Sequence, residues 1–137
     1  MNIEQEIQAV GANVAPRITP ADIEAAIASE HYFTANDGRQ GALSAGTYAG
    51  REKPQANDAD LLPLGLLTFC VLVLRNGFTV TGESACASPE NFDADLGRKI
   101  ARENAKQKLW PLLGYELKQR LHEASIKDAC ERSCEGG

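Results

Sequence analysis

The stretch Cys70-Val-Leu-Val-Leu-Arg-Asn-Gly-Phe-Thr-Val-Thr-Gly-Glu-Ser84 contains two alternating apolar runs on either side of Asn76-Gly77. Asn-Gly between such runs is a strong signal for a tight β-hairpin, because both residues tolerate the positive φ of a type I′ turn. The pattern therefore predicts a hairpin over residues 68–83. A two-residue turn would place Val73 opposite Val80. We expect the core face to consist of Val71, Val73, Phe78 and Val80, and the opposite face of Cys70, Leu72, Leu74, Thr79, Thr81 and Glu83.

A long basic helix is predicted after the hairpin, because Asp93-Ala94-Asp95 is a helix-start signal. The small residues Ala94, Gly97, Ala101 and Ala105 form a stripe that would let this helix approach a sheet or another helix closely. Pro111 removes one backbone hydrogen bond, and the apolar stripe changes phase beyond it. We therefore expect a kink or break at Pro111, with a second helix that ends near Glu123.

The N-terminal part predicts a short helix and a short strand. Thr19-Pro20 is a helix start, with Thr19 as the cap, and the helix would end near Ser29. Residues 31–34 read as a strand that enters a turn at residues 36–38. Residues 39–60 are rich in Gly, Ala, Asp and Gln without any period, which indicates a flexible loop.

These elements predict one α+β domain over residues 18–125. A small antiparallel sheet centred on the 68–83 hairpin would pack against a long, Pro-kinked C-terminal helix, with a short N-terminal helix added. The chain has 137 residues, which is enough for a single hydrophobic core. Residues 1–17 are expected to form a mobile arm, and residues 126–137 a C-terminal tail.

The charge distribution is asymmetric. The net charge is −5, yet the segment from Arg98 to Arg120 contains seven of the fourteen Lys and Arg residues and only two acids. Overall acidity argues against general nucleic-acid binding, whereas the basic segment permits one local anionic partner. No apolar run approaches the roughly 20 residues of a membrane helix, and the N-terminus has no apolar signal core. The sequence therefore predicts a cytosolic protein with no membrane partner.

The residue types favour a binding protein over an enzyme. Gly82-Glu83-Ser84-Ala85-Cys86 lacks the second glycine of a nucleophile elbow. The carboxylates between Glu83 and Asp95 are more typical of helix caps than of a metal site. The four cysteines, Cys70, Cys86, Cys130 and Cys134, are interpreted as reduced thiols, because a chain without a secretion signal rarely forms disulfides. We expect no catalytic residue, no metal and no cofactor.

The basic stripe of the long helix is the clearest functional signal. Arg102 has Arg98 and Lys106 at helical spacing and no acidic neighbour there, and such like-charge pairs cost about 0.2–0.5 kcal/mol each. Either a carboxylate distant in sequence pairs with Arg102, or an anionic ligand does. Because helix N-termini also attract anions, the candidate ligand-binding residues are Ser84, Asn91, Arg98, Arg102 and Lys106.

Several segments together resemble a known family. They are residues 27–34, residues 68–93 with the hairpin, Gly97-Arg-Lys-Ile-Ala-Arg-Glu-Asn-Ala105, and Lys108-Leu-Trp-Pro-Leu-Leu-Gly-Tyr-Glu-Leu117. This combination resembles the gene product 49 / gene product 66 family of small tailed-phage and prophage proteins, over well more than half of the chain. The resemblance implies a phage origin and action in the host cytoplasm, and it implies no catalytic chemistry.

Two functions follow as hypotheses. In the first, the protein is a non-catalytic phage accessory factor for host takeover or anti-defence, which sequesters a small phosphorylated ligand such as a nucleotide second messenger. In the second, it is a module that docks on and inhibits a host or phage protein. We also expect a homo-oligomer, a dimer or higher, because a small sheet leaves open edges and the small-residue stripe favours close packing.

Overall fold

The computed structural model describes residues 3, 5, 15–52 and 59–135. The mobile arm predicted for residues 1–17 lies almost wholly outside the described residues, as does the 53–58 part of the predicted loop. The chain divides into two compact units, residues 27–108 and a second unit that combines residues 1–26 with 109–137.

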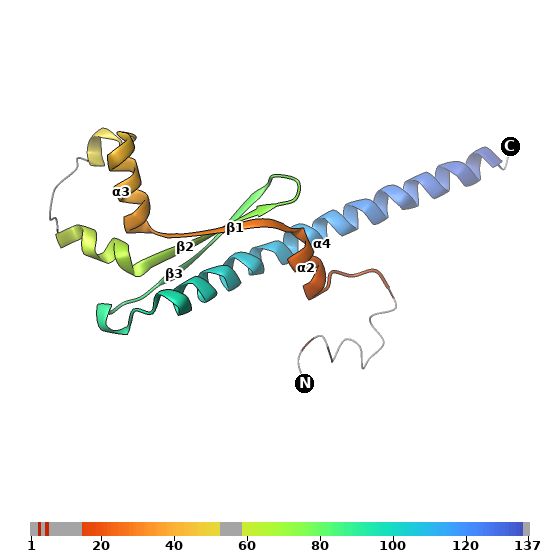
Figure 1. Cartoon of the computed structure of the whole chain (residues 1–137). Coiled ribbons are helices and arrows are strands. Elements are labelled where there is room, and N and C mark those ends of the chain that lie inside the picture. The colour runs from red at the N-terminus through yellow and green to blue at the C-terminus, as the bar shows by residue number, and fades with distance from the viewer. Residues whose placement is uncertain (1–2, 4, 6–14, 53–58, 136–137) are drawn as a thin grey trace. The chain divides into compact units, whose positions relative to one another are not determined.

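The unit of residues 27–108 is built on a three-stranded antiparallel sheet in the order β1-β2-β3 (Figure 1). The strands are β1 (Ile27–Thr34), β2 (Leu67–Leu74) and β3 (Thr79–Ala85). With the long C-terminal helix α4 (Ala94–Glu135) and the short N-terminal helix α2 (Pro20–Ala26), this confirms the predicted α+β fold. Strand β1 begins four residues before the strand predicted for residues 31–34.

The predicted hairpin is present, but its predicted register is wrong by one residue. The Leu74 N–H donates to the Phe78 carbonyl (2.8 Å), and the Gly77 N–H donates to the Leu74 carbonyl (2.9 Å). The loop therefore has three residues, Arg75 to Gly77, and Gly77 has a positive φ, at 89°. Val80 lies opposite Leu72 rather than Val73.

The one-residue shift exchanges the two faces of β2, because side chains alternate along a strand. Cys70, Leu72 and Leu74 are buried, whereas Val71 and Val73 are only half-buried. Phe78, which the sequence placed in the core, is 55% exposed. Of the predicted core face, only Val80 is buried.

The first part of α4 lies unusually close to the sheet. Gly97, Ala101 and Ala105 are buried, which confirms three members of the predicted small-residue stripe, while Ala94 is exposed. A Cβ on Gly82 would lie closer than 3.0 Å to backbone atoms of Ala101 and Ala105. The sheet and the helix therefore meet backbone to backbone at Gly82, where no side chain fits.

Helix α4 is uninterrupted from Ala94 to Glu135, so Pro111 does not break it and the predicted end near Glu123 is wrong. The kink that the sequence offered as the alternative to a break stays a prediction. Pro111 is exposed. A proline removes only its own donor, and water can hydrate the carbonyl one turn earlier, so an exposed proline is tolerated inside a long helix. Residues 126–135 of the predicted tail belong to this helix.

Residues that were predicted to form a turn and an irregular loop form a helix, α3 (Ala35–Ala45). Thr34 and Asp37 make a reciprocal capping box at its start, and Gly46, with a φ of 71°, caps its end. Two short 3₁₀ helices follow, η2 (Gly50–Glu52) and η3 (Ala59–Leu66). An ion pair of 2.6 Å between Arg39 Nη1 and Glu52 Oε2 joins α3 to η2.

Helix α2 begins as the sequence predicts. The Thr19 N–H donates to Asp22 Oδ2 (2.8 Å), and the Asp22 N–H donates to Thr19 Oγ1 (3.3 Å). The hydrogen bond from the Thr19 backbone lowers the pKa of the Asp22 carboxyl below its usual value. The helix ends at Ala26 rather than near Ser29, because Ile27 already pairs with Leu74 in the sheet.

Candidate functional site

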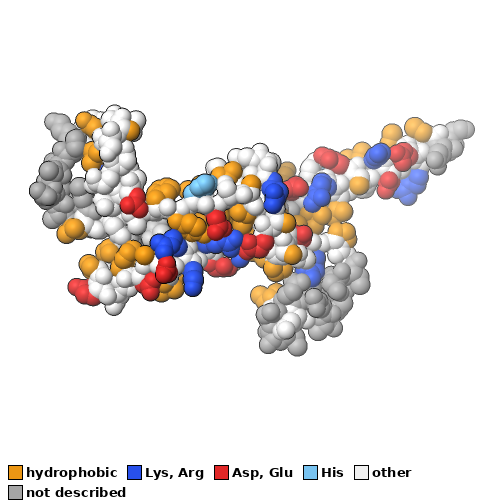
Figure 2. All heavy atoms as spheres, viewed as in Figure 1, with side chains coloured by type: hydrophobic (Ala, Val, Ile, Leu, Met, Phe, Trp, Pro, Cys, Tyr) orange, Lys and Arg blue, Asp and Glu red, His pale blue; other side chains and the backbone are white. Residues whose placement is uncertain are grey.

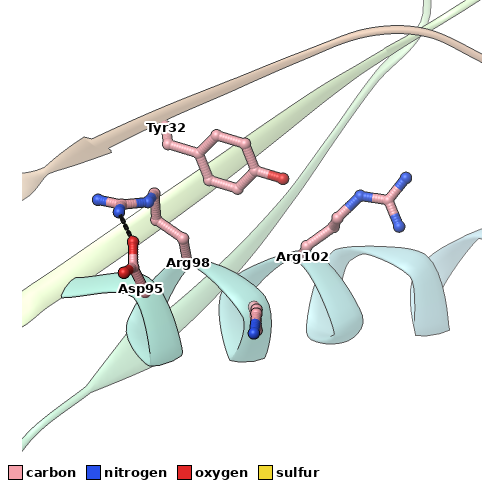
Figure 3. A pocket seen from close by; sticks show the side chains of 5 residues that line it. Tyr32, Asp95, Arg98 and Arg102 are labelled. Atoms are coloured by element: carbon pink, nitrogen blue, oxygen red, sulfur yellow. Dashed lines mark hydrogen bonds and ion pairs between the residues drawn. The ribbon is translucent and has the colours of Figure 1, made fainter. Parts of the chain in front are cut away.

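The candidate site is a surface hollow of about 340 Å³ between β1 and α4. It is lined by Tyr32, Asp95, Arg98, Lys99 and Arg102 (Figure 3). Successive residues of a helix point about 100° apart, so burying Gly97 and Ala101 against the sheet directs Arg98 and Arg102 to the flank beside β1. In Figure 3 the ring of Tyr32 reaches from β1 toward α4, with Arg98 and Arg102 on either side.

Both arginines of the hollow have acidic partners. Arg98 forms an ion pair with Asp95 one turn earlier on α4. Arg102 Nε lies 2.8 Å from Glu30 Oε2 on β1, so a carboxylate distant in sequence does pair with Arg102. All four side chains are at least a quarter exposed, and such exposed pairs contribute at most about 1 kcal/mol each.

Tyr32 and Lys99 are members of the hollow that were not among the predicted ligand-binding residues, and Tyr32 is the one from another element. Burial raises the pKa of Tyr32 to about 12, with Cys70 and Glu30 acting in the same direction. The phenol is therefore a neutral hydrogen-bond donor at physiological pH. The signal that could have found it is strand alternation. A strand starting at Ile27 places Glu30 and Tyr32 on one face, opposite Leu72 and Cys70.

A comparison with known protein families matches residues 18–121 to the phage protein (N4 Gp49/phage Sf6 gene 66) family. The chain belongs to this family. The match spans the whole sheet and the hollow, and it confirms the resemblance noted from the sequence. Membership gives the protein a phage-associated role. No curated protein and no solved structure matches the chain.

The hollow does not include the other three predicted ligand-binding residues of this phage protein. Ser84 is half-buried on β3, opposite Thr68. Asn91 is exposed in the 3₁₀ helix η4 (Pro89–Asn91). Lys106 Nζ lies 3.6 Å from Glu103 Oε2. Of the predicted residues, the hollow brings together Arg98 and Arg102 and adds Lys99.

The start of α4 is capped by its own chain. Asp93 Oδ1 accepts a hydrogen bond from the Leu96 N–H (3.0 Å), which occupies one of the groups that the sequence analysis assigned to an anion. Figure 2 also shows acidic side chains close to the basic ones on the visible face, without a continuous basic surface. Acidic and basic side chains are therefore mixed on the visible face.

Within the described residues, no group of three or more His, Cys, Asp or Glu side chains is placed to hold a metal ion. Among the helices of the described part of the chain, none combines the length and the apolar character that crossing a membrane requires.

The four thiols of this phage protein are expected to react with a disulfide reagent such as DTNB at different rates. Cys130 and Cys134 are exposed, the Cys86 thiol donates to the Ser88 carbonyl (3.1 Å), and Cys70 is fully buried. Burial raises the pKa of the Cys70 thiol, and only the thiolate is nucleophilic. The two exposed thiols should react first and Cys70 only after unfolding, as mass mapping of the labelled protein can test. Labelling of Cys70 at the rate of Cys130 would contradict the burial.

Proposed function

We propose that this phage protein is a non-catalytic accessory factor, acting in the host cytoplasm, that binds a small phosphorylated ligand in the hollow between β1 and α4. Sequestration of such a ligand, for example a nucleotide second messenger, would serve host takeover or anti-defence. The observation that carries the proposal is the convergence of Arg98, Lys99, Arg102 and the Tyr32 phenol on one hollow.

The chemistry of these groups suits a phosphate. A guanidinium presents planar pairs of N–H donors that match phosphate oxygens, and an ammonium adds a compact charge. The neutral phenol of Tyr32 adds a donor and an apolar ring. The three cations outnumber the single carboxylate of Asp95 in the lining, so the hollow keeps a net positive charge.

The carboxylates have a second effect in this proposal. Asp95 and Glu30 hold the two guanidinium groups in place before a ligand arrives, which reduces the ordering cost of binding. A phosphate would then share or replace these carboxylates on the arginines. Since the pairs are partly exposed, exchanging them costs little.

The experiment is mass spectrometry of small molecules released by denaturing protein purified from host cells. Wild-type protein should release a phosphorylated compound, and the Arg98→Ala/Arg102→Ala variant at least about tenfold less, because each charge-assisted hydrogen bond contributes about 1.5–3 kcal/mol. Arg120→Ala is the matched control. It removes another α4 arginine, paired with Glu116 at 3.5 Å, that lies outside the hollow.

The variant must remain folded for this comparison, as circular dichroism can verify. Removing two partly exposed ion pairs should leave the transition cooperative. Release of equal amounts of the compound by the variant and by wild type would move the site elsewhere. Wild-type protein that releases no phosphorylated compound would contradict the proposal itself.

A second candidate function, docking on a host or phage protein, is favoured by a different observation. Beyond Pro111, helix α4 exposes several large apolar side chains, of which Leu112, Tyr115 and Ile126 fall on one side of the helix at 100° per residue. Exposed apolar residues that share a face mark interaction surfaces. The exposed apolar side chains of this part of α4 are Leu112, Tyr115, Leu121 and Ile126. If docking is the function, replacing Tyr115 and Ile126 with serine should abolish co-purification of one defined protein without altering released small molecules.

A further inference from the structure

The two edge strands of the sheet, β1 and β3, differ in whether their outward-pointing backbone groups are hydrogen-bonded. In β3, the residues that pair with β2 through hydrogen bonds alternate with residues whose backbone groups point outward. Leu74 bonds to Phe78, and Cys86 bonds to Leu66, so Thr81 and Glu83 are outward-pointing. Helix α4 covers these positions. Lys108 Nζ donates to the Thr81 carbonyl (2.5 Å), and Asn104 Nδ2 donates to the Glu83 carbonyl (2.8 Å).

These two hydrogen bonds protect the β3 edge. A lysine or amide side chain that occupies the carbonyls of an edge strand blocks the addition of another strand. Because Asn104 and Lys108 lie on the flank of α4 opposite Arg98 and Arg102, the same helix leaves β1 without such cover. Within the described unit of residues 27–108, the sheet therefore has one blocked edge and one open edge.

The open edge consists of two residues of β1. By the same alternation, Glu30 and Tyr32 direct their backbone N–H and C=O groups outward, since Ser29, His31 and Phe33 face β2. Among the described residues, no hydrogen bond reaches these outward groups. The ends of the edge are closed, because the Thr34 N–H donates to Asp37 Oδ2 (2.9 Å) and the ladder is irregular between Ile27 and Ser29.

We propose that the open β1 edge pairs antiparallel with the β1 edge of a second copy of the chain, which joins the two sheets into one six-stranded sheet. The two-fold axis passes through His31. This register uses the two open residues on each chain, with Glu30 opposite Tyr32 of the second copy, and it forms four backbone hydrogen bonds between the copies.

The side chains explain why the partner is a second copy rather than an unrelated strand. A two-fold interface must be self-complementary. The open edge carries the Glu30 carboxylate, whose Oε2 also accepts from Arg102 Nε (2.8 Å), and the Tyr32 phenol. The register places the carboxylate of each copy beside the phenol of the other copy. Glu30 and Cys70 of its own chain already interact with the neutral phenol, so in the dimer each phenol is shared between the Glu30 carboxylates of the two copies.

A cysteine cross-link tests the register directly. Non-hydrogen-bonded residues opposite each other in an antiparallel pair have Cα atoms about 4.5 Å apart, within the range of a disulfide. On the axis, His31 faces itself. In a background with Cys86, Cys130 and Cys134 replaced by serine, His31→Cys should form a disulfide-linked dimer under mild oxidation. Ser29→Cys, two residues earlier on the same face of β1, should not form this disulfide. In the proposed register Ser29 lies opposite Phe33 of the second copy, so the two cysteines at position 29 are too far apart.

The second test uses wild-type protein, so its result does not depend on whether a variant folds. Light scattering at micromolar concentration should give twice the chain mass of 14.7 kDa. Hydrogen exchange should show protected Glu30 and Tyr32 amides, while the outward amides of Thr81 and Glu83 exchange quickly. A monomeric mass, fast exchange at Glu30 and Tyr32, or equal cross-linking at positions 29 and 31 would each overturn the proposal.

Discussion

Gly82→Ala is expected to lower the free energy of unfolding by about 3 kcal/mol, the upper end of what overpacking a core costs. The added Cβ would lie closer than 3.0 Å to the Ala101 carbonyl oxygen and to the Ala105 nitrogen. Both are backbone atoms of α4 and cannot rotate away as a flexible side chain would. The sheet and the helix must separate, and the apolar contacts between them weaken.

Gly114→Ala is the matched control. Gly114 belongs to the same helix, and a Cβ there meets no atom within 4 Å. Since glycine inside a helix is less stable than alanine by about 0.5–1 kcal/mol, this variant should be stabilised by about that amount. Urea denaturation of both variants measures the two effects. A Gly82→Ala protein as stable as wild type would show that α4 is not in backbone contact with β3.

Leu72→Ala is expected to destabilise the protein by about 2–5 kcal/mol, because it deletes a fully buried side chain and leaves a cavity. Val73→Ala, on the neighbouring residue, should cost about 1 kcal/mol, because that side chain is half-buried on the opposite face of the sheet.

This pair of variants tests the hairpin register. With the two-residue turn predicted from Asn76-Gly77, Val73 would be in the core and Leu72 on the other face. The order of the two destabilisations would then be reversed. Equilibrium denaturation of the two variants measures the two losses in free energy of unfolding, and the comparison holds when both variants unfold as cooperatively as wild type. A larger loss for Val73→Ala than for Leu72→Ala would contradict the observed register.

Much of the candidate site could not be predicted from the amino-acid sequence. The basic stripe of α4 was visible from helical spacing, and the sequence left two explanations for Arg102. Its partner Glu30 lies 72 residues away on another element, so no local pattern could choose between them. Tyr32 lay within the predicted strand of residues 31–34, but its position beside α4 follows from the pairing of Tyr32 with Cys70 on β2, which no local pattern shows. Ser84 and Asn91 were placed at the site by proximity in sequence, whereas the fold leaves them outside the hollow.

The local features of this protein were determined by the sequence itself. Alternating apolar residues around Asn76-Gly77 specify a hairpin, Thr19 and Asp22 specify a helix start, and the small residues of α4 specify a close approach to the sheet. Each depends on backbone preferences and spacing over a few residues, which any reader of the chain can evaluate.

Tertiary structure decided the features that depend on competition between distant parts. The observed three-residue turn accompanies the burial of Cys70, Leu72 and Leu74. The gain from burying these side chains exceeds the local preference of Asn-Gly for a two-residue turn. The pairing of Glu30 with Arg102 and the covering of the β3 edge by Asn104 and Lys108 likewise appear only when α4 crosses the sheet. These contacts depend on that packing, because an ion pair or an edge hydrogen bond forms only between groups that the fold has already brought together.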